Sequence, residues 1–382
     1  MGLVTSSRTR IAAVLIAASC MALAACGGSS ETSSTGGGGG SSQFDSASLT
    51  RAKAGIAQYL GKPSPITVTE PLKKRPKAGG TIIFLNCGNA ECQEYYPGLQ
   101  AAAKALGYKT KQVNAGLSPQ TVGAAVDSAI QQNPAGIFDP GLDPFLFQQQ
   151  LKTLQAKHIP VVANAIPEPP GNGISAELAG SKSVFDVGKS MADYVYTQEG
   201  NKADAVFVDS PQIQLSLNMA KGFISELKSL CPQCKASELK VTAASIGTTL
   251  PRREVSYLQQ HPSTNWLVNF AGGLYIGVPQ ALKAAGIKVK SLSQSGGPVN
   301  MQYLKAGLQT ADLTFDYGEV GWMAMDMFAR LNTGQPIPAA EQGNYVPGQL
   351  LTQRDITFDP AGGFVAYPDY EARYKRLWGL GS

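Results

Sequence analysis

The stretch of sequence that decides the fold covers residues 81–113 and reads TIIFLNCGNAECQEYYPGLQAAAKALGYKTKQV. It begins with an apolar run at residues 81–85, which is typical of a buried β-strand. A helical pattern follows at residues 95–106, and Gly107 is the residue type that most often ends a helix. Residues 109–113 form the next expected strand. This strand–helix–strand order predicts a parallel sheet with helices on its faces.

The same alternation continues on both sides of a restart near residue 184. Strands are expected at residues 135–138, 159–163, 203–208, 239–243, 266–270 and 289–292, and helices at residues 119–132, 143–157, 184–197, 215–230, 253–260 and 277–285. The predicted fold class is therefore α/β, with two Rossmann-like lobes built on parallel sheets. Ligands of such sheets bind beyond the carboxyl ends of the strands, so we expect the site in the cleft between the lobes.

The beginning of the chain has the pattern of an export signal. Arg8 and Arg10 precede an apolar run of about 15 residues, which is shorter than the roughly 20 needed to cross a bilayer. The alternative is a short membrane anchor. Residues 23–26, LAAC, resemble the bacterial lipobox, which implies cleavage after residues 1–25 and a lipid on Cys26. Residues 26–42 are expected to be a flexible tether, and residues 43–78 a helix followed by a linker.

Four further cysteines form two close pairs, Cys87 with Cys92 and Cys231 with Cys234. Outside the cytoplasm such pairs are normally oxidised, so two structural disulfides are expected. A redox C-x-x-C motif and a zinc site made by all four cysteines are the alternatives. The redox reading is weakened because the second pair follows a helical segment, whereas a reactive thiolate is favoured at the start of a helix.

Composition and motifs exclude several classes of function. Charged residues make up 15% of the chain and the formal net charge is +5, so no concentrated basic face for nucleic acid is expected. Only two histidines are present, which excludes catalysis or metal binding by several histidines. The chain has no G-x-S-x-G motif and no phosphate-binding loop. We therefore expect neither an enzyme nor a cofactor.

Several local patterns, in their order, resemble the type I periplasmic solute-binding proteins, the ribose-binding-like family that serves ABC importers. The matching segments are residues 97–108 (PGLQAAAKALGY), 135–137 with Pro140, 159–162 (IPVV), 222–223 (GF) and 281–286 (ALKAAG). The resemblance covers about residues 79–356. It implies two lobes joined by a three-strand hinge that closes on a small-molecule ligand. It also implies delivery to a membrane permease with its ATPase.

The resemblance places the three crossings of the hinge near residues 176–184, 314–318 and 345–349. The N-terminal lobe is then expected to contain residues 79–180 and 317–345, and the C-terminal lobe residues 181–316 and 346–382. With the lipid on Cys26, the protein is expected on the outer face of the cytoplasmic membrane. No oligomer is indicated, so a monomer is expected.

The expected cleft departs from the pattern of the sugar-binding members. Where they carry a carboxylate, an arginine and a glutamine, this chain has Asn164, Met219 and Phe315, while two aromatic residues of the family map to Tyr95 and Tyr96. The candidate ligand-binding residues are Asn86, Tyr95, Tyr96, Asn164, Gln214, Asn218, Met219, Phe270, Gly272, Gln294, Ser295, Phe315 and Asp316. Most of the charged groups that read sugar hydroxyls are absent, which favours a ligand less polar than a simple sugar.

Seven of the candidate residues also have a structural alternative. Tyr95 or Tyr96 could belong to the core, Asn164 to a turn, and Phe315 to the packing of the hinge. Gln214 and Asn218 could lie on a solvated helix face, and Asp316 could cap a helix at residues 318–331. Three further alternatives stay open for the function. They are a sugar or polyol binder of the same importer class, a sensory receptor that feeds a membrane signalling protein, and a scaffold without a working pocket.

Overall fold

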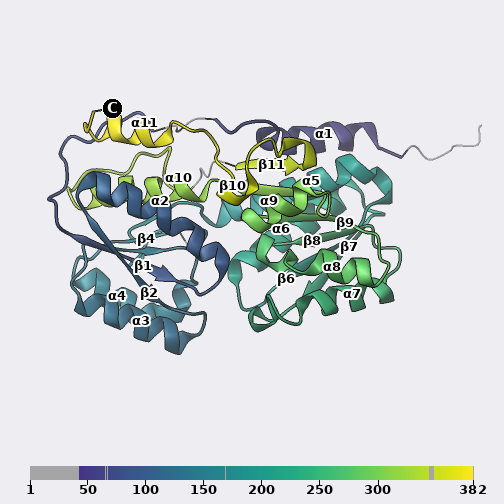
Figure 1. Cartoon of the computed structure of the whole chain (residues 1–382), viewed down its shortest axis with the longest axis horizontal. Helices are drawn as coiled ribbons and strands as arrows, with labels where there is room; N and C mark the ends of the chain where they lie inside the picture. The colour runs from purple at the N-terminus through teal and green to yellow at the C-terminus, as the bar shows by residue number, and fades with distance from the viewer. Residues whose placement is uncertain (1–42, 65, 67, 168, 344–347, 382) are drawn as a thin grey trace, which may run out of the picture. The chain divides into compact units, whose positions relative to one another are not determined.

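The computed structural model describes residues 43–64, 66, 68–167, 169–343 and 348–381. Two α/β lobes, each with its own sheet, account for this part of the chain (Figure 1). The predicted fold class is confirmed. The proposed signal sequence, the lipid site at Cys26 and the tether lie outside the described residues. None of the helices in the described ranges combines the length and the apolar character that crossing a bilayer requires.

The N-terminal lobe contains a fully parallel sheet in the order β2-β1-β3-β4-β5. Its strands are β1 (Thr81–Asn86), β2 (Lys109–Asn114), β3 (Gly136–Asp139), β4 (Val161–Ala163) and β5 (Ala176–Glu177). Its helices are α2 (Ala90–Leu106), α3 (Pro119–Gln131), α4 (Gln148–Ala156), α10 (Tyr317–Leu331) and α11 (Tyr370–Leu377), with a 3-10 turn η2 (Pro144–Phe147) before α4. The sheet is buried on both faces, by one apolar cluster with α2 and α10 and by another with α3 and α4.

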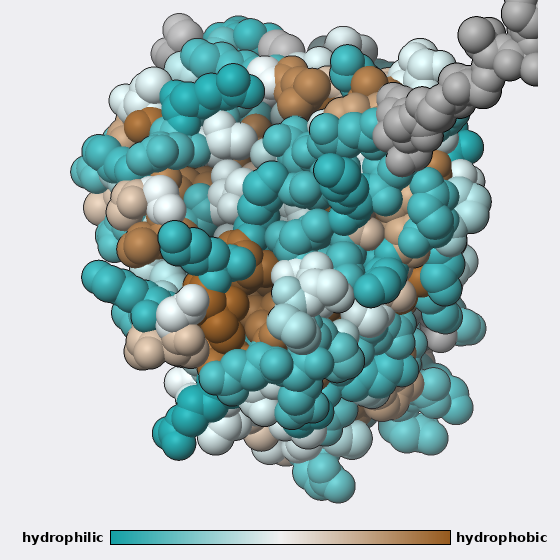
Figure 2. All heavy atoms as spheres, turned by 90° about the vertical axis from the view of Figure 1, so that its right-hand side faces the viewer, coloured by the Kyte–Doolittle hydropathy of each residue, from teal (hydrophilic) through white to brown (hydrophobic). Residues whose placement is uncertain are grey.

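The C-terminal lobe contains a sheet in the order β11-β10-β9-β8-β6-β7, in which only β11 runs antiparallel to its neighbour. Its strands are β6 (Asp204–Asp209), β7 (Lys235–Lys240), β8 (Trp266–Asn269), β9 (Lys290–Gln294), β10 (Ala311–Phe315) and β11 (Gly348–Thr352). Its helices are α5 (Ser181–Glu199), α6 (Gln214–Leu230), α7 (Leu250–Gln260), α8 (Val278–Ala284) and α9 (Pro298–Lys305). The face of this lobe seen in Figure 2 is mostly hydrophilic, with a group of hydrophobic residues near its centre.

Helix α2 and strand β7 differ from their predicted bounds for reasons that the structure makes clear. Helix α2 starts at Ala90 rather than at residue 95, because the Asn89 side chain accepts a hydrogen bond from the Cys92 N–H (2.8 Å) and caps the helix. Strand β7 lies earlier than the predicted strand at residues 239–243. It is an edge strand in which only Leu239 is buried, so it lacks the apolar run on which that prediction depended.

The chain passes between the lobes close to the hinge. It leaves the first sheet after β5 and enters the C-terminal lobe at α5, and it returns from β10 to α10. Residues 345–347 of the third predicted crossing lie outside the described part, and residues 348–349 begin β11. The assignment of residues 346–382 to the C-terminal lobe is wrong for α11. Its Tyr374 and the following Trp378 pack into the core of the N-terminal lobe beside Trp322 of α10.

Both expected disulfides are present. Cys87 and Cys92 are bonded with their Cα atoms 6.0 Å apart, and the corresponding distance for Cys231 and Cys234 is 5.3 Å. The first disulfide joins the end of β1 to the first turn of α2, at the edge of the sheet where a ligand is expected. The second closes the end of α6, because Cys231 is its C-terminal cap residue. The four cysteines therefore form no shared metal site.

Candidate ligand-binding site

Two adjoining cavities lie at the carboxyl ends of strands from both sheets. The larger has a volume of about 330 Å³ and the smaller about 160 Å³. The residues that line both are Tyr95, Pro140, Leu215, Gln294 and Ser295. Tyr95 and Pro140 belong to the N-terminal lobe, whereas the other three belong to the C-terminal lobe. This is the position at which α/β sheets hold their ligands.

A buried amide faces the larger cavity from the N-terminal lobe. Asn164 follows β4, is 2% exposed, and donates from its Nδ2 to the Tyr95 hydroxyl (3.0 Å). Its Oδ1 has no hydrogen-bond partner among the described residues. A buried acceptor without a partner costs about 1–3 kcal/mol. Burial, with a smaller contribution from Glu91, raises the pKa of Tyr95, so its hydroxyl stays neutral.

Gln294 and Ser295 present polar groups from the C-terminal lobe at the end of β9. Ser295 has a φ of 53°, in the left-handed region that non-glycine residues rarely adopt. Its backbone is held on both sides, because its N–H donates to the Leu313 carbonyl (3.1 Å) and its carbonyl accepts from the Tyr317 hydroxyl (2.7 Å). Strain of this kind costs about 1–3 kcal/mol and is concentrated at functional sites.

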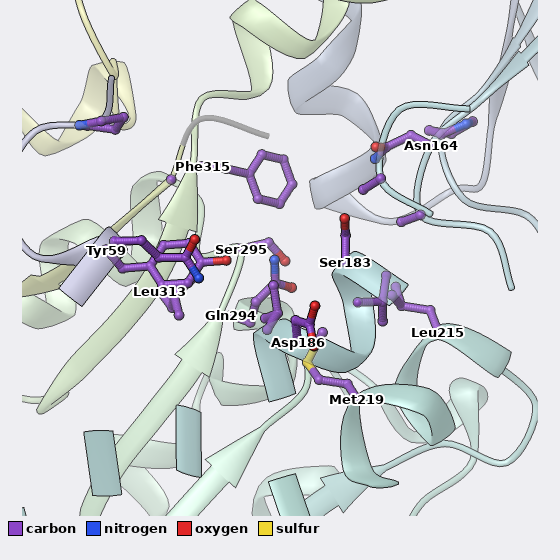
Figure 3. Close-up of a pocket in the computed structure, with 18 of the residues that line it drawn as sticks. Tyr59, Asn164, Ser183, Asp186, Leu215, Met219, Gln294, Ser295, Leu313 and Phe315 are labelled. Atoms are coloured by element: carbon purple, nitrogen blue, oxygen red, sulfur yellow. The ribbon is translucent and has the colours of Figure 1, made fainter. Parts of the chain in front are cut away.

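Aromatic and aliphatic side chains form the rest of the wall. Phe315, at the end of β10, lies 4.6 Å from the ring of Tyr317 and 6.1 Å from that of Tyr95, measured between ring centroids. Leu215 and Met219 project from α6. In Figure 3 the ring of Phe315 lies at one edge of the space that the labelled side chains surround. The cavity is thus suited to a ligand with a substantial apolar surface.

Three carboxylates also line the cavities, and each is engaged within the protein. Glu91 accepts a hydrogen bond from the Gly273 N–H, and Asp143 accepts one from the Gln214 N–H (3.1 Å) at the start of α6. Asp186 forms an ion pair with Lys182. Burial raises the pKa of Glu91 to about 7. Glu91 and Asp143 therefore shape the walls of the cavities, whereas Asp186, whose side chain is 39% exposed, places a negative charge beside the larger one.

The structure brings together about half of the candidate residues. The predicted residues that line the larger cavity are Tyr95, Asn164, Met219, Gln294, Ser295 and Phe315, and Phe270 lines the smaller one. Tyr95 and Phe315 also belong to the aromatic core of the N-terminal lobe. Each of these two residues therefore packs in the core and lines the cavity. Within the described residues, no cluster of histidine, cysteine and carboxylate side chains is arranged to hold a metal ion.

Two candidates from the N-terminal lobe lie outside the linings of both cavities. The Asn86 side chain donates to Gln112 Oε1 (3.1 Å), and its own oxygen accepts from the Gly88 N–H (2.9 Å). The Tyr96 hydroxyl bonds to Thr110 Oγ1 (3.1 Å), on the face of α2 that covers the sheet. Both side chains hold local structure around β1 and β2.

Four candidates from the C-terminal lobe and the hinge also lie outside these linings. Gln214 begins α6, and Asn218 donates to the Ser181 carbonyl (2.7 Å) and so joins α6 to α5. Gly272 lies so close to Gly296 that a Cβ atom would be 2.5 Å from the Gly296 Cα. Asp316 caps α10 by accepting from the Glu319 N–H (3.0 Å), which is the capping alternative. Short polar residues near strand ends have such local uses, which explains these differences.

Sequence reasoning missed several lining residues. Leu215, Ser183 and Asp186 sit on α5 and α6 at positions that resemble an ordinary amphipathic helix face. A more distant group belongs to the segment expected to be a linker. It consists of Gln58, Tyr59, Pro63 and Ser64, which line the larger cavity although they precede β1. No local signal in the sequence marks these residues, because their place depends on a long-range contact.

A comparison with protein families gives a match over residues 82–336 to the family described as periplasmic binding protein domain. A comparison with curated proteins gives no match. Among solved structures, GanP, a glucose-galactose binding protein from Geobacillus stearothermophilus, is similar with a TM-score of 0.65 and 18% identity, covering 74% of this chain and 100% of that one. A 5-methylthioribose transporter solute-binding protein from Thermotoga lettingae gives 0.66 and 17%, with coverages of 81% and 99%. A solute-binding protein from Agrobacterium vitis, with bound allitol, gives 0.63 and 20%, with coverages of 73% and 97%.

Proposed function

The chain belongs to the periplasmic binding protein domain family, and on this premise we propose that it is an extracytoplasmic receptor that captures a small solute and delivers it to an ABC importer. The observation that carries the proposal is the pair of adjoining cavities between the lobes, with the buried amide of Asn164 in the lining of the larger one. Contacts made with both lobes exist only when the cleft is closed, so binding shifts the population toward the closed form.

The chemistry of the lining supports a ligand less polar than a simple sugar. The polar side chains contributed by Asn164, Gln294 and Ser295 are uncharged, and the carboxylates in the lining already have partners within the protein. Aromatic and aliphatic side chains cover much of the remaining wall. Each sugar hydroxyl that is buried without a partner costs free energy, so a ligand that carries an apolar group beside its hydroxyls suits this lining better than an unsubstituted sugar.

Lipid attachment at Cys26 is part of the same proposal. The lipobox-like sequence, followed by a tether rich in glycine and serine, would hold the receptor near the permease on the outer face of the membrane. Mass spectrometry of the membrane fraction tests this, because a diacylglycerol on Cys26 adds a fixed mass. A chain that keeps residues 1–25, or a free Cys26 thiol, would contradict it.

A sugar or polyol ligand is the second candidate, because the similar solved structures include proteins described with allitol and with glucose and galactose. A sensory receptor would use the same closure, and inspection of the neighbouring genes separates it from a transport receptor. Titration calorimetry against pentoses, hexoses, polyols, aromatic acids and steroid-like acids separates the ligand classes. Nanomolar binding of an unsubstituted hexose would overturn the less polar ligand.

A pair of matched variants tests the site itself. Asn164→Ala should weaken binding of the best compound in that panel about ten-fold, the equivalent of one hydrogen bond. Asn332→Ala is the control, because Asn332 makes a similar bond to a tyrosine, Tyr108 (2.9 Å), outside both cavities. Equal affinities of the two variants would show that the ligand does not contact Asn164.

A further inference from the structure

The N-terminal arm, residues 43–80, lies outside the matched family domain and is anchored first to the C-terminal lobe. Its helix α1 (Ser46–Ile56) packs on α5, with Ala52 and Ile56 buried in the core of that lobe. The contact with α5 is close, because a Cβ atom on Gly55 would be 1.9 Å from Asp193 Oδ2. The Gln43 carbonyl accepts from the Asn201 N–H (2.7 Å). The first half of the arm is therefore an integral part of this lobe.

The second half of the arm is anchored to the N-terminal lobe. The Ile66 N–H donates to the Tyr367 hydroxyl (2.7 Å), and the Leu72 N–H donates to the Leu377 carbonyl (2.9 Å). The buried Arg330 of α10 donates to the Glu70 carbonyl (2.6 Å). The arm thus passes from one lobe to the other between residues 56 and 66, on the side of the hinge.

Tyr59 lies in this passage, on the 3-10 turn η1 (Ala57–Tyr59), and lines the larger cavity. Its ring is packed against β11, because a Cβ atom on Gly348 would be 3.5 Å from Tyr59 Cε1. Burial, together with the charge of Asp186, raises the pKa of Tyr59 to about 12. At neutral pH the side chain is therefore an uncharged ring with a hydroxyl.

The two ends of the larger cavity differ in polarity. Tyr59 and Leu313 lie at one side of the view in Figure 3, and Asn164 lies at the other. Gln294 and Ser295 lie between them and also face the smaller cavity. Hydrogen-bonding groups from both lobes therefore lie toward the cleft, whereas the side closed by the arm adds the ring of Tyr59 and the aliphatic chain of Leu313 to the polar side chains of Gln58 and Ser64.

We propose that the arm is part of the binding site, and that Tyr59 selects a sugar-like ligand that carries an apolar substituent. The polar ring would bond to Asn164, Gln294 and Ser295, and the substituent would pack against Tyr59 and Leu313. Aromatic side chains favour flat or apolar groups on their faces. This inference rests on the proposed function, and it names the class of solute that the receptor takes.

Titration calorimetry with matched pairs of glycosides tests the inference. The probes are the methyl and phenyl β-glycosides of glucose, galactose and ribose. For the sugar that binds, the phenyl glycoside should bind the wild-type protein at least about ten-fold more tightly than the methyl glycoside. Tyr59→Ala should remove that preference and leave the methyl glycoside within about two-fold of its wild-type affinity. Tyr59→Phe should retain the preference, because it keeps the ring.

Leu60→Ala is the control, because Leu60 is the next residue on the arm, is 57% exposed, and lies outside the lining of both cavities. Tyr59→Leu guards against a folding defect, since it keeps apolar bulk but lacks the ring face, and it should behave as Tyr59→Ala does. A phenyl preference that survives in both variants overturns the role of Tyr59 while the proposed function stands. If none of the six glycosides binds, the sugar-like ligand class is overturned, and the inference fails with it.

Discussion

Replacement of Trp378 tests whether the C-terminal helix belongs to the N-terminal lobe. The Trp378 side chain is 1% exposed, and its ring stacks on Trp322 of α10 with centroids 5.2 Å apart and planes 8° apart. Its indole N–H donates to Asp326 Oδ1 (2.6 Å), and the other oxygen of Asp326 is paired with the buried Arg330. One side chain therefore contributes both packing and a hydrogen bond to a buried carboxylate.

The two contributions can be separated by two substitutions. Truncation of a buried tryptophan to alanine costs about 3–5 kcal/mol, so Trp378→Ala should lose about 5 kcal/mol because Asp326 also loses its donor. Trp378→Phe keeps a stacked ring and removes only the N–H, so it should lose about 2 kcal/mol. Val365→Ala is the control, because Val365 lies in the same terminal segment but is 52% exposed, and it should lose less than about 0.5 kcal/mol.

The assay is unfolding in guanidinium chloride, followed by far-ultraviolet circular dichroism and by tryptophan fluorescence. Two lobes can unfold separately, so each transition is fitted on its own. The loss of stability should appear in the unfolding transition of the N-terminal lobe, which contains Trp322. The transition of the C-terminal lobe, which contains Trp266, should stay unchanged. A loss below about 1 kcal/mol for Trp378→Ala would refute the packing of α11 on α10.

Three further changes should be measurable by chemical or thermal unfolding. Burial raises the pKa of Glu319 to about 8, so the stability that its protonated form contributes is complete below about pH 4.5 and is lost as the pH rises through about 8. Glu319→Gln should flatten this decline of stability with pH. A pH profile that is the same in the variant and the wild type would contradict this prediction. Cys87→Ser should lose about 2 kcal/mol by opening the short loop to Cys92, and a reductant should then have less further effect than on the wild type. Asp143→Ala should lose about 1.5 kcal/mol because the Gln214 N–H at the start of α6 loses its acceptor. If Asp143→Asn loses less, the difference between the two variants measures the contribution of the negative charge at the start of the helix.

The fold could be predicted from sequence because buried parallel strands leave a local signature. The strands that were found, such as β1 and β8, are short runs of apolar residues bounded by polar turns. Strand β10 was missed although all five of its residues are buried, because Asp312 and Thr314 break its apolar run. Both polar side chains accept or donate hydrogen bonds within the lobe, so their burial is satisfied by contacts that the sequence does not reveal.

Part of the candidate site could be predicted because some residues follow directly from a strand, whereas Tyr95 and Met219, which lie on helices, were found through the family resemblance. Asn164 and Ser295 come immediately after β4 and β9, and parallel topology then brings their side chains to one cleft. Tyr59 could not be found in this way, since it precedes the first strand and reaches the cavity through the packing of α1 on α5. Such a contact depends on tertiary structure alone, and the proline-rich composition that follows Tyr59 indicated only a linker.

Two buried carboxylates, Asp139 and Asp312, hold loops of the cleft without lining either cavity. Asp139, at the end of β3, accepts from the N–H groups of Gly141 (3.0 Å) and Leu142 (2.7 Å) and thereby shapes the loop that carries Pro140. Asp312 accepts a hydrogen bond from the Gly296 N–H (2.9 Å), next to Ser295. Burial raises the pKa of each to about 7.

These carboxylates position the backbone of the cleft, and most of the contacts left for a ligand come from uncharged groups. Salt screens interactions between charges that are exposed to solvent, and it acts little on hydrogen bonds between neutral groups in a closed cavity. The affinity for a neutral solute should therefore change less than about two-fold between 0.05 and 0.5 M sodium chloride, an interval over which the Debye length falls from about 14 to about 4 Å. A steep loss of affinity with salt would instead mean that one of the carboxylates exchanges its internal partner for a charged ligand.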